Sequence, residues 1–122
     1  MHFFIYFTMT EGEPMNPPSA EGMAKMGKLM QDAFASGRIV ATGKLPREVT
    51  NIQLQQGEFS ISDGPFIEGK ELIPGFTVIN AESKQEALQW AQQMRECMGD
   101  GTLKMAQLMG TSADDMKMKP NA

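Results

Sequence analysis

The stretch HFFIYFTM, residues 2–9, decides the fold, and the rest of the chain is organised around it. It is rich in Phe, Ile and Tyr, which favour β-structure, and it predicts a buried strand. His2, Phe4 and Tyr6 alternate along it and therefore share one face. Tyr6 is the only tyrosine and a candidate to place a hydroxyl in a cleft lined by the sheet. His2 is the only histidine, the residue type suited to proton transfer near neutral pH, although a lone histidine at a strand start is more often a surface residue.

Two helices are predicted from periodicity and end signals. The first follows Ser19, a candidate N-cap, and stops at Gly37. The second follows Ser83, where a capping box has Glu86 reaching back from the third helical position, and it stops at Gly99. Apolar or small side chains recur at helical spacing at Ala20, Met23, Met26, Gly27, Met30, Ala33 and Phe34, and again at Ala87, Leu88, Ala91, Met94 and Met98.

The other strands are predicted at residues 39–45, 51–55, 58–62, 72–80 and 103–109. Residues 51–55 and 58–62 form a hairpin around Gln56-Gly57, and Pro74 places a bulge or sheet edge in the following strand. This order predicts an α+β fold of the ferredoxin-like β-α-β-β-α-β type, with an extra hairpin before the third core strand. We expect one domain over residues 1–110 and a polar tail over 111–122.

The predicted architecture leaves one sheet face uncovered, because both helices lie on the other face. A bare apolar face must be buried against something. A second copy of the chain, packed sheet against sheet, is the simplest solution, so we expect a homodimer.

Composition narrows the function classes. The chain has 122 residues, a net charge of −4 and no block of lysine or arginine, which argues against nucleic-acid binding. One cysteine, Cys97, and one histidine cannot form an ordinary zinc site or an internal disulfide, so no metal or cofactor is predicted and a reducing cytoplasm is expected. No apolar run approaches the roughly 18 residues of a membrane span.

The segment SDGPFIEGKE, residues 62–71, raises the main functional question. Asp63 and Gly64 suggest a turn, and an aspartate in a turn usually accepts the N–H two residues later. Here that residue is Pro65, which has no N–H, so the carboxylate must bond elsewhere: to Phe66, to another strand or to a ligand. A structural turn and a functional Asp63 both remain open.

The sequence Asp63-Gly64-Pro65-Phe66 is followed by Glu68, Lys70-Glu71, Gly75-Phe76, and a helix with Glu86-Ala87-Leu88 and Trp90-Ala91. With these features the chain resembles the DGPF group of the YCII-related proteins over residues 3–110. The resemblance implies a ferredoxin-like fold in dimeric α/β-barrel form and a cleft near Asp63. Some branches of the family pair that aspartate with a histidine in the first helix for acid–base chemistry. In this chain residues 19–36 contain no histidine.

Two hypotheses follow. In the first, the protein is a small cytoplasmic homodimer that binds a small organic molecule, with Asp63 transferring a proton in a cofactor-independent lyase, isomerase or dehydrohalogenase-like reaction. Tyr6, His2, Gly64, Pro65 and Phe66 would line the ligand site, and Glu68 and Lys70 would orient the ligand or be exposed loop charges. In the second, it is a non-catalytic ligand-binding or regulatory module, since the resemblance also implies a link to sigma-factor genes.

Overall fold

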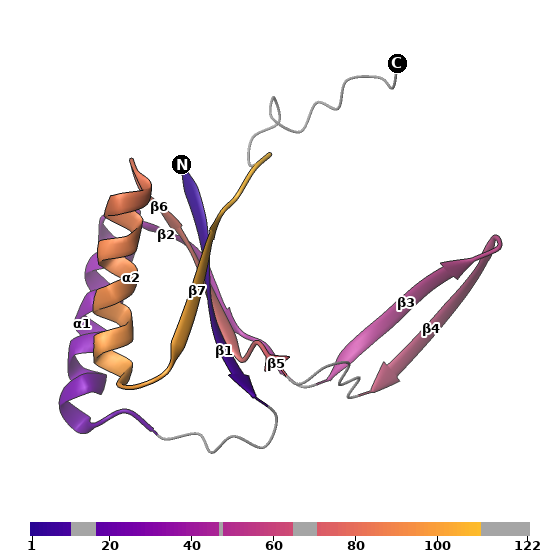
Figure 1. Cartoon of the computed structure of the whole chain (residues 1–122), viewed down its shortest axis with the longest axis horizontal. Coiled ribbons are helices and arrows are strands. Elements are labelled where there is room, and N and C mark those ends of the chain that lie inside the picture. Colours follow the sequence, from indigo (N-terminus) through magenta and orange to yellow (C-terminus); the bar gives the residue numbers. More distant parts are fainter. Residues whose placement is uncertain (11–16, 47, 65–70, 111–122) are drawn as a thin grey trace.

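The computed structural model of the chain describes residues 1–10, 17–46, 48–64 and 71–110 (Figure 1). The elements, in chain order, are β1 (His2–Thr10), α1 (Ala20–Ala35), β2 (Ile39–Lys44), β3 (Val49–Gln55), β4 (Glu58–Gly64), β5 (Glu71–Leu72), β6 (Gly75–Asn80), α2 (Lys84–Met98) and β7 (Thr102–Gln107). The predicted order of helices and strands is confirmed. The hairpin strands are longer than predicted, and the last strand ends before Leu108.

The core sheet is antiparallel throughout, with β1 paired to both β6 and β7, and β6 paired to β2. Its strand order is therefore β2-β6-β1-β7, which makes the residue 2–9 segment an interior strand. This α+β arrangement is compatible with the predicted ferredoxin-like fold. β3 and β4 form a separate two-stranded sheet.

The predicted irregularity at Pro74 is confirmed. β5 and β6 both pair with β1: Tyr6 lies opposite Phe76, and Met9 lies opposite Leu72. The partner segment therefore advances by four residues where β1 advances by three. The extra residue is a bulge, and Pro74 lies between the two short strands, where its missing N–H does not interrupt a ladder.

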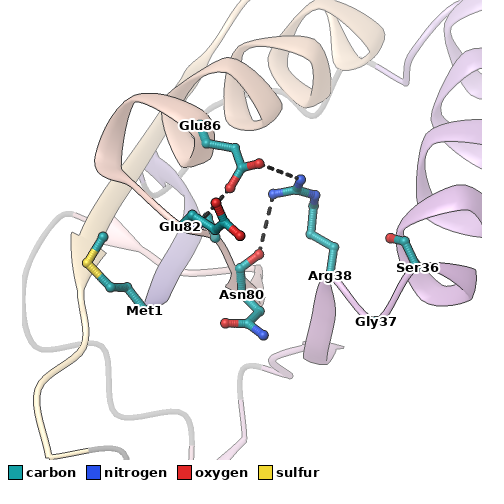
Figure 2. A pocket seen from close by; sticks show the side chains of 8 residues that line it. Met1, Ser36, Gly37, Arg38, Asn80, Glu82 and Glu86 are labelled. Carbon is teal, nitrogen blue, oxygen red and sulfur yellow. Dashed lines mark hydrogen bonds and ion pairs between the residues drawn. The ribbon is translucent and has the colours of Figure 1, made fainter.

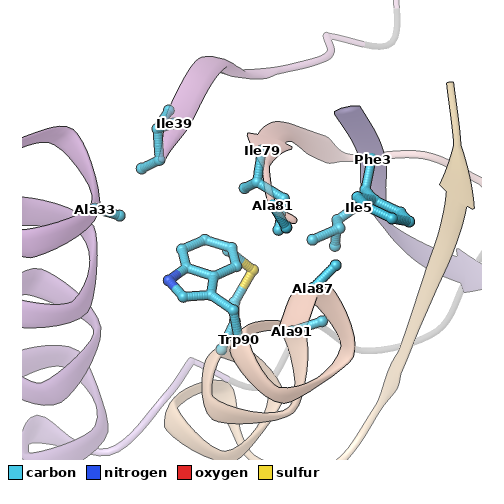
Figure 3. Close-up of a cluster of buried hydrophobic side chains, with 10 residues drawn as sticks. Phe3, Ile5, Ala33, Ile39, Ile79, Ala81, Ala87, Trp90 and Ala91 are labelled. Atoms are coloured by element: carbon cyan, nitrogen blue, oxygen red, sulfur yellow. The ribbon is translucent and has the colours of Figure 1, made fainter. Parts of the chain in front are cut away.

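Both helices cover one face of the core sheet (Figure 1). Phe3 and Ile5 point to that side and are each 1% exposed, so the alternation along β1 correctly separated the two faces. They pack with Ile79, Trp90 and neighbouring side chains in one hydrophobic cluster (Figure 3). No helix within the described ranges is both long and apolar enough to cross a membrane.

The helical stripes are partly different from those predicted. Met23 and Phe34 are 61% and 57% exposed, and Leu88 is 45% exposed. The buried positions are Gly22 and Ala33 on α1, and Ala87, Trp90, Ala91 and Met94 on α2. The helices pack on each other as well as on the sheet, and this contact selects small residues such as Gly22 that periodicity alone does not single out.

The predicted helix caps are present, with one correction. The Ser19 hydroxyl accepts from the Gly22 N–H at 3.0 Å, and the Ser83 hydroxyl accepts from the Glu86 N–H at 3.1 Å. A capping box would require the Glu86 side chain to accept from the Ser83 N–H, and Glu86 does not make this bond. Its Oε2 instead accepts from the Glu82 N–H at 2.7 Å, and its Oε1 pairs with Arg38.

Candidate functional site

The face of the core sheet opposite the helices, here called the open face, has an aromatic centre. Tyr6 lies opposite Phe76 on the neighbouring strand, and Phe4 lies opposite Val78. The Phe4 ring is 5.2 Å from the Tyr6 ring and 5.7 Å from the Phe76 ring, centroid to centroid. These separations are typical of packed aromatic pairs. We call Phe4, Tyr6 and Phe76 the aromatic platform; their side chains are only half-buried in the single chain.

Two basic residues lie near the aromatic platform. Lys104 lies opposite Tyr6 on β7, and His2 lies opposite Asn80 at the start of β1. The register places no carboxylate on the open face of β1, β2, β6 or β7 within their described residues. On these four strands the open face is therefore aromatic at its centre, with the basic residues Lys104 and His2 beside the platform.

Asp63 lies on a strand rather than in a turn. It is opposite Thr50 in the β3–β4 ladder, and the Thr50 hydroxyl donates to Asp63 Oδ1 at 2.6 Å. The carboxylate that Pro65 deprives of a local N–H is thus bonded across the hairpin, and this bond fixes its orientation. Asp63 is exposed in the single chain, and Gly64 ends β4 opposite Val49. Four other predicted site residues, Pro65, Phe66, Glu68 and Lys70, lie outside the described residues.

The hairpin of β3 and β4, here called the arm (Val49–Gly64), has one apolar face. Ile52 is paired with Ile61 and Leu54 with Phe59, and the period of two places all four on the same side as Asp63. These four side chains are 63–71% exposed, and we call them the arm's apolar face. The alternation in NIQLQ and EFSIS is visible in the sequence, but sequence analysis did not single out this surface.

The single chain does not bring Asp63 to Tyr6 and His2. The two strands of the arm pair with each other and with no other described strand. Figure 1 shows the arm extending away from the core sheet on the side opposite the helices. The predicted site residues therefore fall into two groups, one on the open face and one on the arm.

A separate hollow of about 270 Å³ lies where β2 begins, β6 ends and α2 begins (Figure 2). Its central cation is Arg38, which is 3.3 Å from Glu86 Oε1 and donates to the Asn80 carbonyl oxygen at 3.3 Å. Of the predicted site residues that the structure describes, none lines it. Because its arginine links three elements of the fold, we interpret this hollow as a structural junction.

This junction predicts a pH dependence of stability. The Glu82 N–H and then the Arg38 guanidinium hold the pKa of Glu86 below its ordinary value of 4.5. Because this pKa is lower in the folded state than in the unfolded state, the ionised Glu86 stabilises the fold at every pH above the unfolded-state pKa. This stabilisation is lost as the pH falls through the lowered pKa of the folded state. Glu86→Gln should therefore be less stable than the wild type at neutral pH. The difference in stability between the two proteins should become smaller when the pH is lowered below the folded-state pKa of Glu86.

Urea unfolding at several pH values measures this effect. Glu21→Gln is the matched control, because Glu21 forms an i,i+4 pair with Lys25 at 3.1 Å in which the side chains are 79% and 67% exposed. Such exposed ion pairs contribute little to the free energy of unfolding. A stability difference for Glu86→Gln that is the same at every pH would contradict the assignment to charge.

Comparison with known proteins supports the resemblance to the YCII-related family. The sequence model of the YCII-related domain matches residues 1–103, from the first strand into β7, and so includes both helices and the arm. None of the curated proteins matches the chain significantly.

Proposed function

Because the chain belongs to the YCII-related domain family, we propose that it forms a homodimer which binds a small organic molecule between the aromatic platform and Asp63. One observation carries the proposal: the open face is an aromatic surface with a hydroxyl and basic groups beside it, and no described element covers it. Exposure of such an apolar face to water is energetically unfavourable. A second copy and a ligand together would cover it.

The residues around the platform favour a particular kind of ligand. The packed rings of Phe4, Tyr6 and Phe76 offer a surface for a planar or apolar body. The Tyr6 hydroxyl and the basic groups of His2 and Lys104 suit oxygen substituents on it. Small organic acids and phenols combine these features and are the first compounds to test.

Asp63 supplies the acid–base chemistry in this proposal. An oriented carboxylate accepts a proton from a bound ligand. In an isomerase it returns this proton at another position of the ligand, and in a lyase it passes the proton to the group that departs with the electron pair of the broken bond. The hydrogen bond from Thr50 holds Oδ1 in place, so the carboxylate is already oriented when the ligand arrives. Gly64, the last residue of β4, would shape the same edge of the site.

A second candidate, ligand binding without catalysis, is favoured by one feature. The helix α1 carries no histidine, and the only imidazole, His2, lies on β1 at the edge of the platform. Asp63 would then recognise a donor group of the ligand without taking a proton. The two candidates share a site and differ in whether ligand turns over.

Asp63→Asn should keep the fold and weaken ligand binding at least about tenfold, a typical loss when a charged hydrogen-bonding partner is removed. The test is a thermal-shift screen of organic acids and phenols, followed by calorimetry and a turnover assay on each hit. Glu58→Gln is the matched control, since it removes one carboxylate from the far end of the same arm. A compound that stabilises the wild type and Asp63→Asn equally would remove Asp63 from the site.

A further inference from the structure

We propose that the arm of each chain lies on the open face of its partner, so that each ligand site combines the aromatic platform of one chain with Asp63 of the other. This inference rests on the homodimer proposed above and specifies how it is built. It makes the site incomplete in a single chain. Four properties of the arm and the open face support it.

The arm needs a partner surface for its own stability. A two-stranded hairpin is marginally stable in water unless it packs on something. The arm's apolar face has four large side chains that are 63–71% exposed. Together they present on the order of a few hundred Å² of apolar surface, the upper range of what a soluble monomer leaves exposed in one patch. Some surface must therefore cover this face.

The open face complements the arm in charge. The arm carries no lysine or arginine, and Asp63 is the charged residue on its apolar side, because Glu58 lies with Ser60 on the other side. Beside the aromatic platform the open face carries Lys104 and His2, and the carboxylate residue that the register places on this face, Glu71, lies opposite Thr10 at the other end of β1 from His2. Contact of the arm's apolar face with the aromatic platform brings Asp63 toward basic residues, whereas contact between the apolar faces of two arms offers Asp63 no basic residue, which favours the first arrangement.

The arm is placed to reach another molecule. The Leu45 N–H donates to the Pro74 carbonyl oxygen at 2.9 Å, which ties the chain just before the arm to the junction of β5 and β6. From this fixed base the arm extends away from its own sheet (Figure 1). A two-fold exchange would form the contact twice, and an interface of this kind approaches the usual size of about 800 Å² per partner.

The register of the arm then determines where Asp63 lies. Asp63 is on the same side of the arm as Ile61 and Phe59. When that side packs on the partner's aromatic platform, the Asp63 carboxylate and its Thr50 partner face the same surface. The exposed position of Asp63 in one chain becomes an enclosed position between two.

Substitutions on the two faces of the arm test this arrangement. Ile61→Glu puts a charge into the proposed contact and should weaken dimerisation about 100-fold or more in sedimentation. Ser60→Glu is the matched control, because Ser60 is the adjacent residue on the opposite face of the arm, and it should remain a dimer. Ala106→Glu, opposite Phe4 on the open face, should weaken dimerisation as Ile61→Glu does. All three positions are exposed, so the circular dichroism spectra should match the wild type; Ile61→Ser replaces Ile61→Glu if that variant does not fold.

Mixing the two defective variants gives the decisive result. In a mixed dimer, the arm of the Ala106→Glu chain is intact and meets the intact open face of the Ile61→Glu chain. One of the two contacts is then wild type, and mixing should recover dimers at least about tenfold more tightly than either variant alone. Contact of arm with arm would leave Ala106→Glu dimeric, and contact of sheet with sheet would leave Ile61→Glu dimeric. Either of these results, or failure of the mixture to recover dimers, would overturn the proposal.

The outcomes separate this inference from the proposed function. A wild-type protein that is monomeric at micromolar concentration would overturn both. A dimeric wild type with a dimeric Ile61→Glu variant would overturn the arm exchange alone, and the homodimer would stand.

Discussion

Replacing Gly22 by alanine is expected to lower the free energy of unfolding by about 1–3 kcal/mol or more. Gly22 is buried in the first turns of α1, and a Cβ built there collides with the backbone carbonyl oxygen of Cys97 in the last turn of α2. A backbone atom cannot rotate aside as a flexible side chain can, so the two helices must separate. The lost packing should outweigh the better helix propensity of alanine.

Gly27→Ala on the same helix is the matched control and should change stability in the opposite direction. Its Cβ meets no atom within 4 Å, and the position is exposed. Alanine there should stabilise the protein by about 0.5–1 kcal/mol, because glycine loses more conformational freedom on folding. Denaturant unfolding of both variants compares the two values. Equal stabilisation by the two changes would show that α1 and α2 do not approach closely at Gly22.

Ile79→Ala should cost about 2–5 kcal/mol, the usual range for removing a large buried aliphatic side chain. Ile79 is 0% exposed and lies on β6 between β1 and β2, where it packs in the cluster under both helices. The loss is a large part of the total stability of a domain, about 5–15 kcal/mol. Thermal and denaturant unfolding should both show it.

Ile73→Ala makes the same chemical change at a position that is 40% exposed. Ile73 lies between β5 and β6, outside both strands. The expected cost is smaller, below about 1.5 kcal/mol, because less apolar surface was buried and no closed cavity is left. Similar costs for the two isoleucines would contradict the placement of the core on the helix side of β6.

The sequence by itself determined the features that depend on neighbours along the chain. The alternation in residues 2–9 assigned Phe3 and Ile5 to one face of β1 and Tyr6 to the other, because the strand period is two. The N-caps Ser19 and Ser83 and the interruption at Pro74 also follow from local hydrogen-bonding chemistry.

Tertiary structure decided the features that depend on contacts between distant segments. Glu86 bonds Glu82 and Arg38 because β2 begins beside α2, and α1 buries Gly22 in place of Met23 because α2 lies against it. The hydrogen-bond partner of Asp63 is Thr50 because the hairpin register sets the two residues opposite each other. The Glu86 and Gly22 contacts form only when distant elements pack together, and the Asp63 partner is set by the turn at Gln56-Gly57, which determines the register of the whole hairpin.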